Sequence, residues 1–457
     1  MFAEEDTIAA IATPLGTGSI SVIRVSGPQA IKNISKIFSS KNSQKILSQV
    51  NSHTVHHGFI LDQKQEILDE VLITIFKKPT SFTGEDVVEI SGHGGILVTK
   101  LLLERVLSTN IRIAQPGEFS KRAFLNGKID LIQAEAIMDL ITSKNKNAVK
   151  IANSGLQKKT SQLIKKFNDE ILSLIGQIEV NIDYPEYEDI PVMTNKIILP
   201  KIKLLIKQIN LILKNFNKIN LLKEGIKVVI IGKPNVGKSS LLNTLLEKER
   251  AIVSDIAGTT RDFVDVQITI NGITLNLIDT AGIRETIDPL EKMGVENTKK
   301  LLSEADLVLL VLDQNSYLTS EDKILLDLTR QHVRIIVANK SDLPSVMKIN
   351  LKEEIIFISN KTKKGIEYLK QKILKIFHLD YLEEQDFNYF LNIRHIQQLK
   401  IALKALKIVQ RDIIKEIPID MHTIYLKEAF SALGEILGYK TDECLLNELF
   451  SKFCLGK

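Results

Sequence analysis

Residues 232–239 read Gly-Lys-Pro-Asn-Val-Gly-Lys-Ser, which is the pattern of a phosphate-binding loop. In such a loop, backbone N–H groups surround the phosphates of a nucleotide, and the amino-terminal end of the next helix adds a positive dipole. Lys238 is predicted to bind the β- and γ-phosphates and so to act in catalysis, and the Ser239 hydroxyl is predicted to ligate Mg²⁺. The alternative interpretation is a chance glycine turn before a helix.

The residues on either side of this loop favour the nucleotide-binding interpretation. Residues 227–231 are a short, β-branched apolar run typical of a buried strand, and residues 240–246 have the pattern of the first turns of a helix. A strand, a glycine-rich loop and a helix in this order form the arrangement that holds a nucleotide. The other loop residues expected to contact it are Asn235, Val236, Gly237 and Ser240.

Two further motifs follow in the order found in GTP-binding domains. Residues 277–282 end a strand with Asp-x-x-Gly, so Asp279 is expected beside the Mg²⁺ and the N–H of Gly282 beside the γ-phosphate. Residues 339–342 read Asn-Lys-Ser-Asp, and Asp342 is predicted to accept hydrogen bonds from N1–H and the 2-amino group of guanine. Because adenine has an acceptor at N1 and no 2-amino group, this motif predicts GTP rather than ATP.

The remaining predicted contacts come from two other segments. Ser359 and Asn360 stand where a second guanine-contacting dipeptide is usually Ser-Ala, so Asn360 is a departure from that pattern. Residues 254–261 lie between the phosphate loop and Asp279, and Thr260 is placed to ligate Mg²⁺ and act in catalysis when the γ-phosphate is present. Further predicted GTP contacts are Ser254, Asp255, Ile256, Ala257, Gly258, Thr259, Thr280, Ala281, Asn339 and Lys340.

Position 283 carries Ile where Ras-like GTPases carry a Gln that orients the attacking water. No arginine finger is obvious either, since Arg284 is interpreted as a solvated residue of a switch segment. Another positive charge must therefore stabilise the transition state. An oxygen of Asn235, with the backbone carbonyls of Ser254 and Ile256, is predicted to bind K⁺ beside the phosphates. Asn235 is equally explained as a residue that shapes the loop.

Length and composition set the frame for these sites. The chain of 457 residues is long enough for about three domains. Its net charge of +5, from 60 basic and 55 acidic residues, permits a nucleic-acid partner without requiring one. The two cysteines, Cys444 and Cys454, are no disulfide framework and favour a reducing compartment. With an acidic start and no long uncharged apolar run, we expect a cytoplasmic protein without a membrane segment.

The periodicity of the chain changes several times. Strand candidates at 20–25, 71–76 and 87–90 are followed by helical patterns from about 125 to 180 and from 197 to 222. Residues 225–378 then alternate strands with helices, as a doubly wound parallel sheet does; its strand candidates are 227–231, 274–279, 306–312, 334–338 and 355–358. We therefore predict a P-loop GTPase domain inserted into a helical domain, after an N-terminal α+β domain. The predicted bounds are 1–120 (N-terminal), 121–220 and 379–457 (helical), and 221–378 (GTPase).

Several of these motifs together resemble the MnmE (also called TrmE) family of tRNA-modification GTPases. The resemblance covers essentially the whole chain, and the segments that carry it are 81–95, 116–128, 232–240, 255–262, 279–284 and 453–457. The last, Phe-Cys-Leu-Gly-Lys, is the most specific, because general GTPases lack it. The resemblance implies a K⁺-dependent GTPase that is activated when GTPase domains dimerise. It places Thr259 in the K⁺ loop and makes Glu291 the catalytic residue that orders the attacking water, whereas the residues alone favour a solvated helix carboxylate there.

The resemblance also implies a one-carbon folate, 5-formyltetrahydrofolate or a relative, bound by an N-terminal domain that forms a homodimer. Its ligands carry over onto Arg24, Glu89, Lys128 and Lys457. Glu89 suits the N–H donors of a pterin, and the cations suit carboxylate or ring oxygens. Cys454 lies beside the presumed site; a nucleophilic or redox role and a packed terminal cysteine both remain open.

The chemistry implied by the resemblance is a substitution at C5 of the wobble uridine of certain tRNAs. It requires a separate FAD-dependent subunit of the MnmG (GidA) type, in a heterotetramer or larger complex, and folate supplies the one-carbon unit. Two other interpretations remain: a ribosome-assembly or signalling GTPase switch, and a GTP-dependent scaffold that does not hydrolyse GTP. The folate residues and the terminal Cys-Leu-Gly-Lys favour the first interpretation, because a simple switch does not need them.

Overall fold

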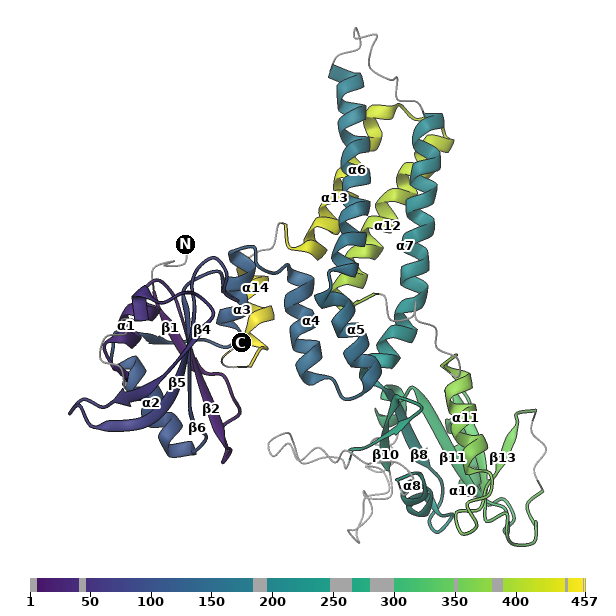
Figure 1. The fold of residues 1–457 in the computed structure, drawn as a ribbon. Helices are drawn as coiled ribbons and strands as arrows, with labels where there is room; N and C mark the ends of the chain where they lie inside the picture. The colour runs from purple at the N-terminus through teal and green to yellow at the C-terminus, as the bar shows by residue number, and fades with distance from the viewer. Residues whose placement is uncertain are drawn as a thin grey trace. The chain divides into compact units, whose positions relative to one another are not determined.

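The computed structural model describes residues 6–40, 47–183, 195–246, 265–279, 300–348, 352–379, 389–439, 443–454 and 456. The chain divides into two compact units (Figure 1). The first comprises residues 1–138, 161–194 and 412–457, and the second comprises residues 139–160 and 195–411. Each unit therefore contains segments that are far apart in the sequence.

The first unit is built on a seven-stranded sheet with the strand order β3-β4-β5-β6-β2-β1-β7. Neighbouring strands are antiparallel except β1 and β7. The strands are β1 (Ile8–Ile11), β2 (Ile20–Ser26), β3 (Phe38–Ser40), β4 (Thr54–Leu61), β5 (Ile67–Phe76), β6 (Val87–His93) and β7 (Arg112–Ile113). Alternate residues of β5, Val71, Ile73 and Ile75, are buried on one face of the sheet. The predicted strands 20–25, 71–76 and 87–90 are confirmed, whereas β1, β3, β4 and β7 were not predicted.

Helices α1 and α2 pack on this sheet, and the unit also contains helices that pack on one another. The bounds are α1 (Ala30–Ser35), α2 (Ile96–Leu107), α3 (Glu118–Leu125), α6 (Lys159–Asp183), α13 (His422–Leu437) and α14 (Glu443–Ser451), and α4 (Leu131–Thr142) runs from this unit into the second. Helix α14 packs on α3, and Phe450 and Phe453 join Leu131 in one apolar cluster. Helix α14 and Phe453 are thereby held against α3 and α4.

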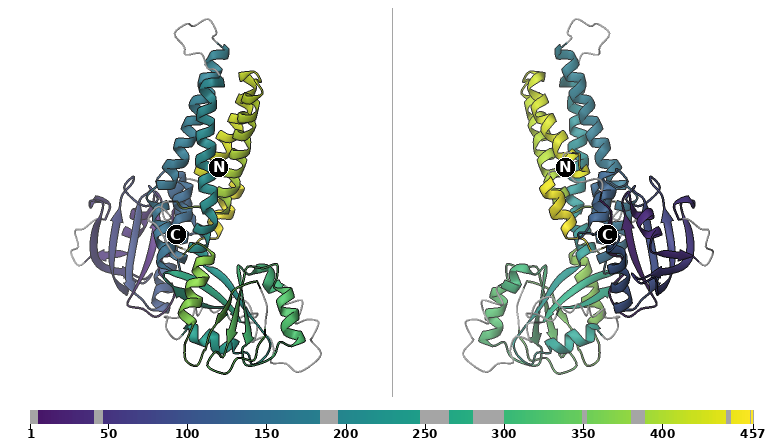
Figure 2. Two further views of the ribbon diagram at one scale, coloured as in Figure 1. Left: turned by 90° about the vertical axis from the view of Figure 1, so that its right-hand side faces the viewer. Right: turned by 90° about the vertical axis from the view of Figure 1, so that its left-hand side faces the viewer.

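The second unit contains a six-stranded sheet with the order β13-β12-β11-β8-β10-β9. Its parallel strands are β8 (Ile226–Ile231), β10 (Ile273–Asp279), β11 (Leu307–Asp313), β12 (Arg334–Asn339) and β13 (Ile355–Phe357). Helices α8 (Lys238–Leu246), α10 (Ser320–Leu328) and α11 (Ile366–Ile376) accompany them, and Figure 2 shows α10 and α11 on opposite faces of the sheet. This is the predicted doubly wound arrangement, with all five predicted strands confirmed.

One strand of this sheet was not predicted. β9 (Asp265–Ile270) pairs antiparallel with β10 through a two-residue turn at Asn271 and Gly272, both at positive φ. An Asn-Gly pair between alternating strands is a strong hairpin signal, so the sequence did contain the information.

The same unit contains α5 (Lys146–Leu156), α7 (Asn195–Glu224) and α12 (Ile393–Ile414). The predicted helix 197–222 is confirmed as part of α7. In the sequence, the strands of the GTPase sheet lie between helices α7 and α12. This order agrees with a GTPase domain inserted into a helical domain. Among the described residues, no helix is long and apolar enough to cross a membrane. The four predicted domain bounds stay a prediction.

Asn145 joins a helix to the GTPase sheet in the second unit. Its side-chain oxygen accepts from the N–H of Ala148 at 2.8 Å and so caps α5, and its amide donates to Oγ1 of Thr274 at 2.9 Å and to the carbonyl of Leu222 at 3.3 Å. All three hydrogen bonds are buried. A polar group that lost its partner here would therefore destabilise the fold, because water could not replace the missing bond.

We expect Asn145→Ala to lower the free energy of unfolding of this unit by about 1–3 kcal/mol, because it removes a cap and leaves Thr274 unpaired. Urea unfolding of the full chain measures the shift. Asn153→Ala, at an exposed position of the same helix, is the matched control and should change little. Equal effects of the two substitutions would contradict the structural role of Asn145.

Candidate nucleotide site

The phosphate-binding loop connects β8 to α8, and its backbone conformation requires particular residue types. Asn235 has φ +64° and Gly237 has φ +95°, the left-handed region that Asn tolerates and Gly favours. A Cβ on Gly237 would also lie 2.3 Å from Nδ2 of Asn339, so only glycine fits. Val236 between them is completely buried and anchors the loop. The sequence pattern thus folds as a phosphate-binding loop must.

Lys238 is the first residue of α8, and its side chain turns back over the loop. Its Nζ donates to the carbonyl of Gly232 at 2.9 Å and to the carbonyl of Lys233 at 3.0 Å. These bonds hold the ammonium at the mouth of the loop, where the phosphates of a nucleotide would lie. The hydroxyl-bearing residues Ser239 and Ser240 follow in the first turn of the helix.

A buried ion pair supports the loop from α10. Nζ of Lys233 lies 2.9 Å from Oδ2 of Asp322, whose side chain is 2% exposed. Burial opposes ionisation of this carboxyl, yet hydrogen bonds from Thr319 and from Lys233 lower its pKa below the ordinary value. Asp322 also forms a capping box with Thr319 at the start of α10. The carboxylate of Asp322, which the sequence pattern did not single out, therefore helps to hold the phosphate-binding loop in place.

The base-reading segments are tied to the phosphate loop by two side-chain amides. Nδ2 of Asn339, at the end of β12, donates to the carbonyl of Val236 at 2.8 Å. Nδ2 of Asn360 donates to the next carbonyl, that of Gly237, at 3.1 Å. The N–H of Asn360 also approaches Oδ1 of Asn339 at 3.4 Å. The departure from Ser-Ala at position 360 is therefore accommodated by an additional hydrogen bond to the loop.

Asp342 is oriented by a buried serine. Oγ of Ser359, which is fully buried, donates to Oδ1 of Asp342 at 2.6 Å and accepts from the N–H of Thr362 at 3.1 Å. The bond from Ser359 holds the pKa of Asp342 below its ordinary value. The exposed carboxylate is thus ionised and held in one direction, as an acceptor for two guanine N–H groups must be. Beside it, Nζ of Lys340 pairs with Oδ2 of Asp313 at 2.6 Å.

In the first unit, Arg24 and Glu89 form an ion pair across neighbouring strands. They are directly opposite in the register of β2 and β6, and Nη2 of Arg24 lies 2.8 Å from Oε1 of Glu89. The guanidinium is 5.8 Å from the ring centroids of both Phe82 and Phe119. Both charged side chains remain partly exposed, at 19% and 26%, so a ligand can reach them.

The end of the chain reaches this ion pair. Nη1 of Arg24 donates to the carbonyl of Gly456 at 3.2 Å. Gly456 has φ +89°, and a Cβ there would lie 2.5 Å from the carbonyl of Ile11, so the approach requires glycine. Cys454 is exposed and has a free thiol, which places it at the surface rather than in the core. Lys128 donates to the carbonyl of Pro79 at 2.9 Å, at the start of the loop that carries Phe82.

Comparisons with known proteins agree with this geometry. A family model described as the MnmE helical domain matches residues 131–454, and one described as the GTP-binding protein TrmE N-terminus matches residues 7–128. A tRNA modification GTPase MnmE from Aster yellows witches'-broom phytoplasma is 57% identical over 99% of both chains. The chain belongs to the MnmE family. The MnmE of Listeria innocua is 45% identical over 99% of this chain and 100% of its own.

Membership of the MnmE family confirms the predicted resemblance, the fold class and the interpretation as a GTPase of tRNA modification. A solved GTPase domain, from the FeoB iron transporter of T. maritima, covers 33% of this chain and 97% of its own at 29% identity. The TM-score of this match is 0.25.

Several predicted residues of this MnmE-family chain lie outside the described part of the structure. These are Ser254, Asp255, Ile256, Ala257, Gly258, Thr259, Thr260, Thr280, Ala281, Gly282, Ile283, Arg284, Glu291 and Lys457, together with the side chain of Asp279. The structure brings Lys238, Asn339, Asp342, Ser359 and Asn360 to the carboxyl ends of β8, β12 and β13. Their roles in binding GTP stay predictions.

Sequence reasoning did not single out the residues that hold the predicted ones in place. Asp313 ends β11 and pairs with Lys340, and its position at the carboxyl end of a parallel strand was a usable signal. Asp322 was signalled by the Thr-x-x-Asp pattern of a capping box. Phe82 carried no such signal, because only the tertiary fold places it against Arg24.

We expect Asp342→Asn to weaken GTP binding at least about 100-fold, because two hydrogen bonds to a charged acceptor, each of about 1.5–3 kcal/mol, are lost. The asparagine amide can donate to the 2-carbonyl of xanthine, so the variant should prefer xanthosine triphosphate. Calorimetric titration with both nucleotides measures the exchange. Asp327→Asn, on the exposed face of α10, is the charge-matched control. Unchanged GTP affinity of Asp342→Asn would refute its predicted role.

Proposed function

We propose that this chain is a K⁺-dependent GTPase that works with an FAD-dependent subunit of the MnmG type to modify C5 of the wobble uridine of certain tRNAs. A folate supplies the one-carbon unit, and GTP hydrolysis drives the complex through its cycle. The chain acts as a cytoplasmic homodimer through its N-terminal domain, within a heterotetramer or larger complex. Two relatives named tRNA modification GTPase MnmE, which are 57% and 55% identical to this chain, support this proposal.

The observation that carries the proposal is the contact between the end of the chain and the Arg24–Glu89 pair. The backbone carbonyl of Gly456 accepts a hydrogen bond from the guanidinium of Arg24, and a simple GTPase switch does not need a C-terminal tail that makes such a contact. The residues present suit a folate: Glu89 can accept from pterin N–H groups, Arg24 can meet an oxygen, and Phe82, which is 36% exposed, offers a ring for stacking. Lys128 and Lys457 complete the proposed ligand set.

At the GTP site, each proposed role belongs to a residue with suitable chemistry. Lys238 stabilises the charge that develops on the β- and γ-phosphates, and Ser239 and Thr260 ligate Mg²⁺. Glu291 accepts hydrogen bonds from water and so orders the attacking molecule. Asp342 selects guanine.

K⁺ would be held by the side chain of Asn235 together with Ser254, Ile256 and Thr259. The Asn235 side chain is exposed, and among the described residues it has no hydrogen-bond partner, so its oxygen is available to a cation. When bound, K⁺ supplies positive charge that an arginine finger supplies in other GTPases, where it is worth about 10³–10⁵ in rate.

The cation proposal predicts that GTP turnover is much faster in KCl than in NaCl at equal ionic strength, and that Asn235→Ala loses most of this difference. Steady-state phosphate release measures both. Asn243→Ala, an exposed asparagine on α8, should keep the K⁺ response. Equal wild-type rates in the two salts would refute the role of Asn235 in cation binding.

The decisive test of the function is deletion of residues 454–457, which removes the tail but keeps the packed Phe453. We expect the wobble-uridine modification to disappear from cellular tRNA, while GTP turnover of the purified protein largely survives. Mass spectrometry of tRNA nucleosides from a complemented deletion strain gives the readout. Lys452→Ala, whose side chain is 72% exposed, is the control. Full modification by the truncated protein would overturn the proposal.

A further inference from the structure

Positive charge is concentrated on two helices of the second unit. Helix α7 has seven lysines and one glutamate, and α12 has five basic residues and one aspartate, so these helices together carry a net charge of +10. The whole chain carries only +5, so the rest of it carries −5. A general abundance of lysine therefore does not explain the imbalance.

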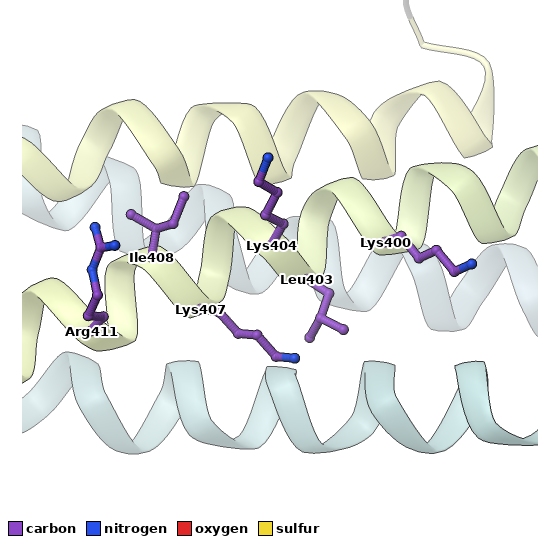
Figure 3. Close-up of a pocket in the computed structure, with 6 residues that line it drawn as sticks. All are labelled: Lys400, Leu403, Lys404, Lys407, Ile408 and Arg411. Carbon is purple, nitrogen blue, oxygen red and sulfur yellow. The ribbon is translucent and has the colours of Figure 1, made fainter.

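Four of the five basic residues of α12 line an open groove with a volume of about 410 Å³. Lys400, Lys404, Lys407 and Arg411 follow one another along the helix, with Leu403 and Ile408 between them (Figure 3). Figure 3 also shows α7 running alongside α12, with Lys407 and Leu403 directed toward it. On α7, Lys201, Lys203, Lys207 and Lys214 are exposed and add to the positive potential on this helix pair.

The row of cations on α12 does not stabilise the helix. The apolar stripe of α12, with Ala402, Leu406 and Val409, is buried and suffices to hold it in place. The cations on the exposed face are three or four residues apart, a spacing at which like charges destabilise a helix by about 0.2–0.5 kcal/mol per pair. The only acidic residue of α12, Asp412, is buried.

The three lysines of the groove are available to a partner. Within the part of the chain that the structure describes, Lys400, Lys404 and Lys407 form no ion pair and donate no hydrogen bond to another side chain. From Lys400 to Arg411 the row extends about 16 Å along the helix axis, at about 1.5 Å per residue. Such a row of exposed cationic groups matches a chain of regularly spaced anions.

We propose that this cationic groove binds the sugar–phosphate backbone of tRNA; the inference rests on the proposed function and assigns the docking surface for its substrate. Phosphate contacts supply affinity and orientation without reading sequence, which suits an enzyme that modifies several tRNAs. An anionic membrane is the less suitable partner. Leu403 is buried and Ile408 is half-buried, so the groove offers charge and little apolar surface to insert into lipid.

The test is the triple variant Lys400→Ala, Lys404→Ala and Lys407→Ala in the full chain. With unmodified tRNA as the probe, we expect its Kd to rise about 10-fold or more at moderate salt. The slope of log Kd against log salt should fall by about one per lysine. GTP turnover without tRNA should equal that of the wild type, because the groove is not part of the nucleotide site, and an unchanged thermal unfolding curve confirms that the variant folds.

The control is the triple variant Lys100→Ala, Lys165→Ala and Lys166→Ala, which removes the same charge from exposed helix positions of the first unit. It should bind tRNA like the wild type. Unchanged tRNA affinity and salt slope in the groove variant would overturn the inference, as would a selective loss of binding to phosphatidylglycerol vesicles. Neither result affects the proposed function, which fails separately if cells lacking the protein keep their wobble modification.

Discussion

The nucleotide site depends on two amides that connect its halves. Asn339 and Asn360 donate to the successive carbonyls of Val236 and Gly237, across more than 100 residues of sequence. Because both carbonyls belong to the phosphate loop, a displacement of the loop also displaces the segments proposed to read the base. The glycine at 237 is required for the same reason, since any Cβ there would collide with the Asn339 amide. The phosphate loop and the segments proposed to read the base are therefore held in one fixed arrangement.

A second long-range contact joins the carboxyl-terminal part of the chain to the N-terminal sheet. The carbonyl of Gly456 accepts from Arg24, 432 residues earlier in the sequence, while α14 packs on α3 through Phe450 and Phe453. The tail is held partly by apolar packing and partly by a glycine that can approach Ile11. The Gly456 carbonyl thereby lies at a partly exposed ion pair whose guanidinium faces two aromatic rings.

The positive charge of this protein is concentrated on two helices, which the small net charge of the whole chain does not reveal. Two helices with +10 coexist with a remainder of −5, and the excess lies on the exposed side of helices whose apolar stripes are buried. Repulsion between the exposed lysines along α12 is a small cost to the free protein, and a polyanionic partner would remove it. Directional hydrogen bonds therefore hold the nucleotide site together, and apolar packing holds α14 and Phe453 in place. The groove on α12 would act through electrostatic attraction.

The sequence by itself determined the GTPase fold and the order of its motifs, because each motif is local. Positive φ at Asn235 and Gly237, a buried run such as β11 and an Asn-Lys-x-Asp motif after a strand are fixed by neighbouring residues. Short strands such as β1 and β7 escaped prediction, because they form only when paired with distant segments. The contacts of Asn360, Phe82 and Gly456, and the groove on α12, were decided by tertiary structure. They depend on which distant surfaces meet, and neither spacing nor composition contains that information.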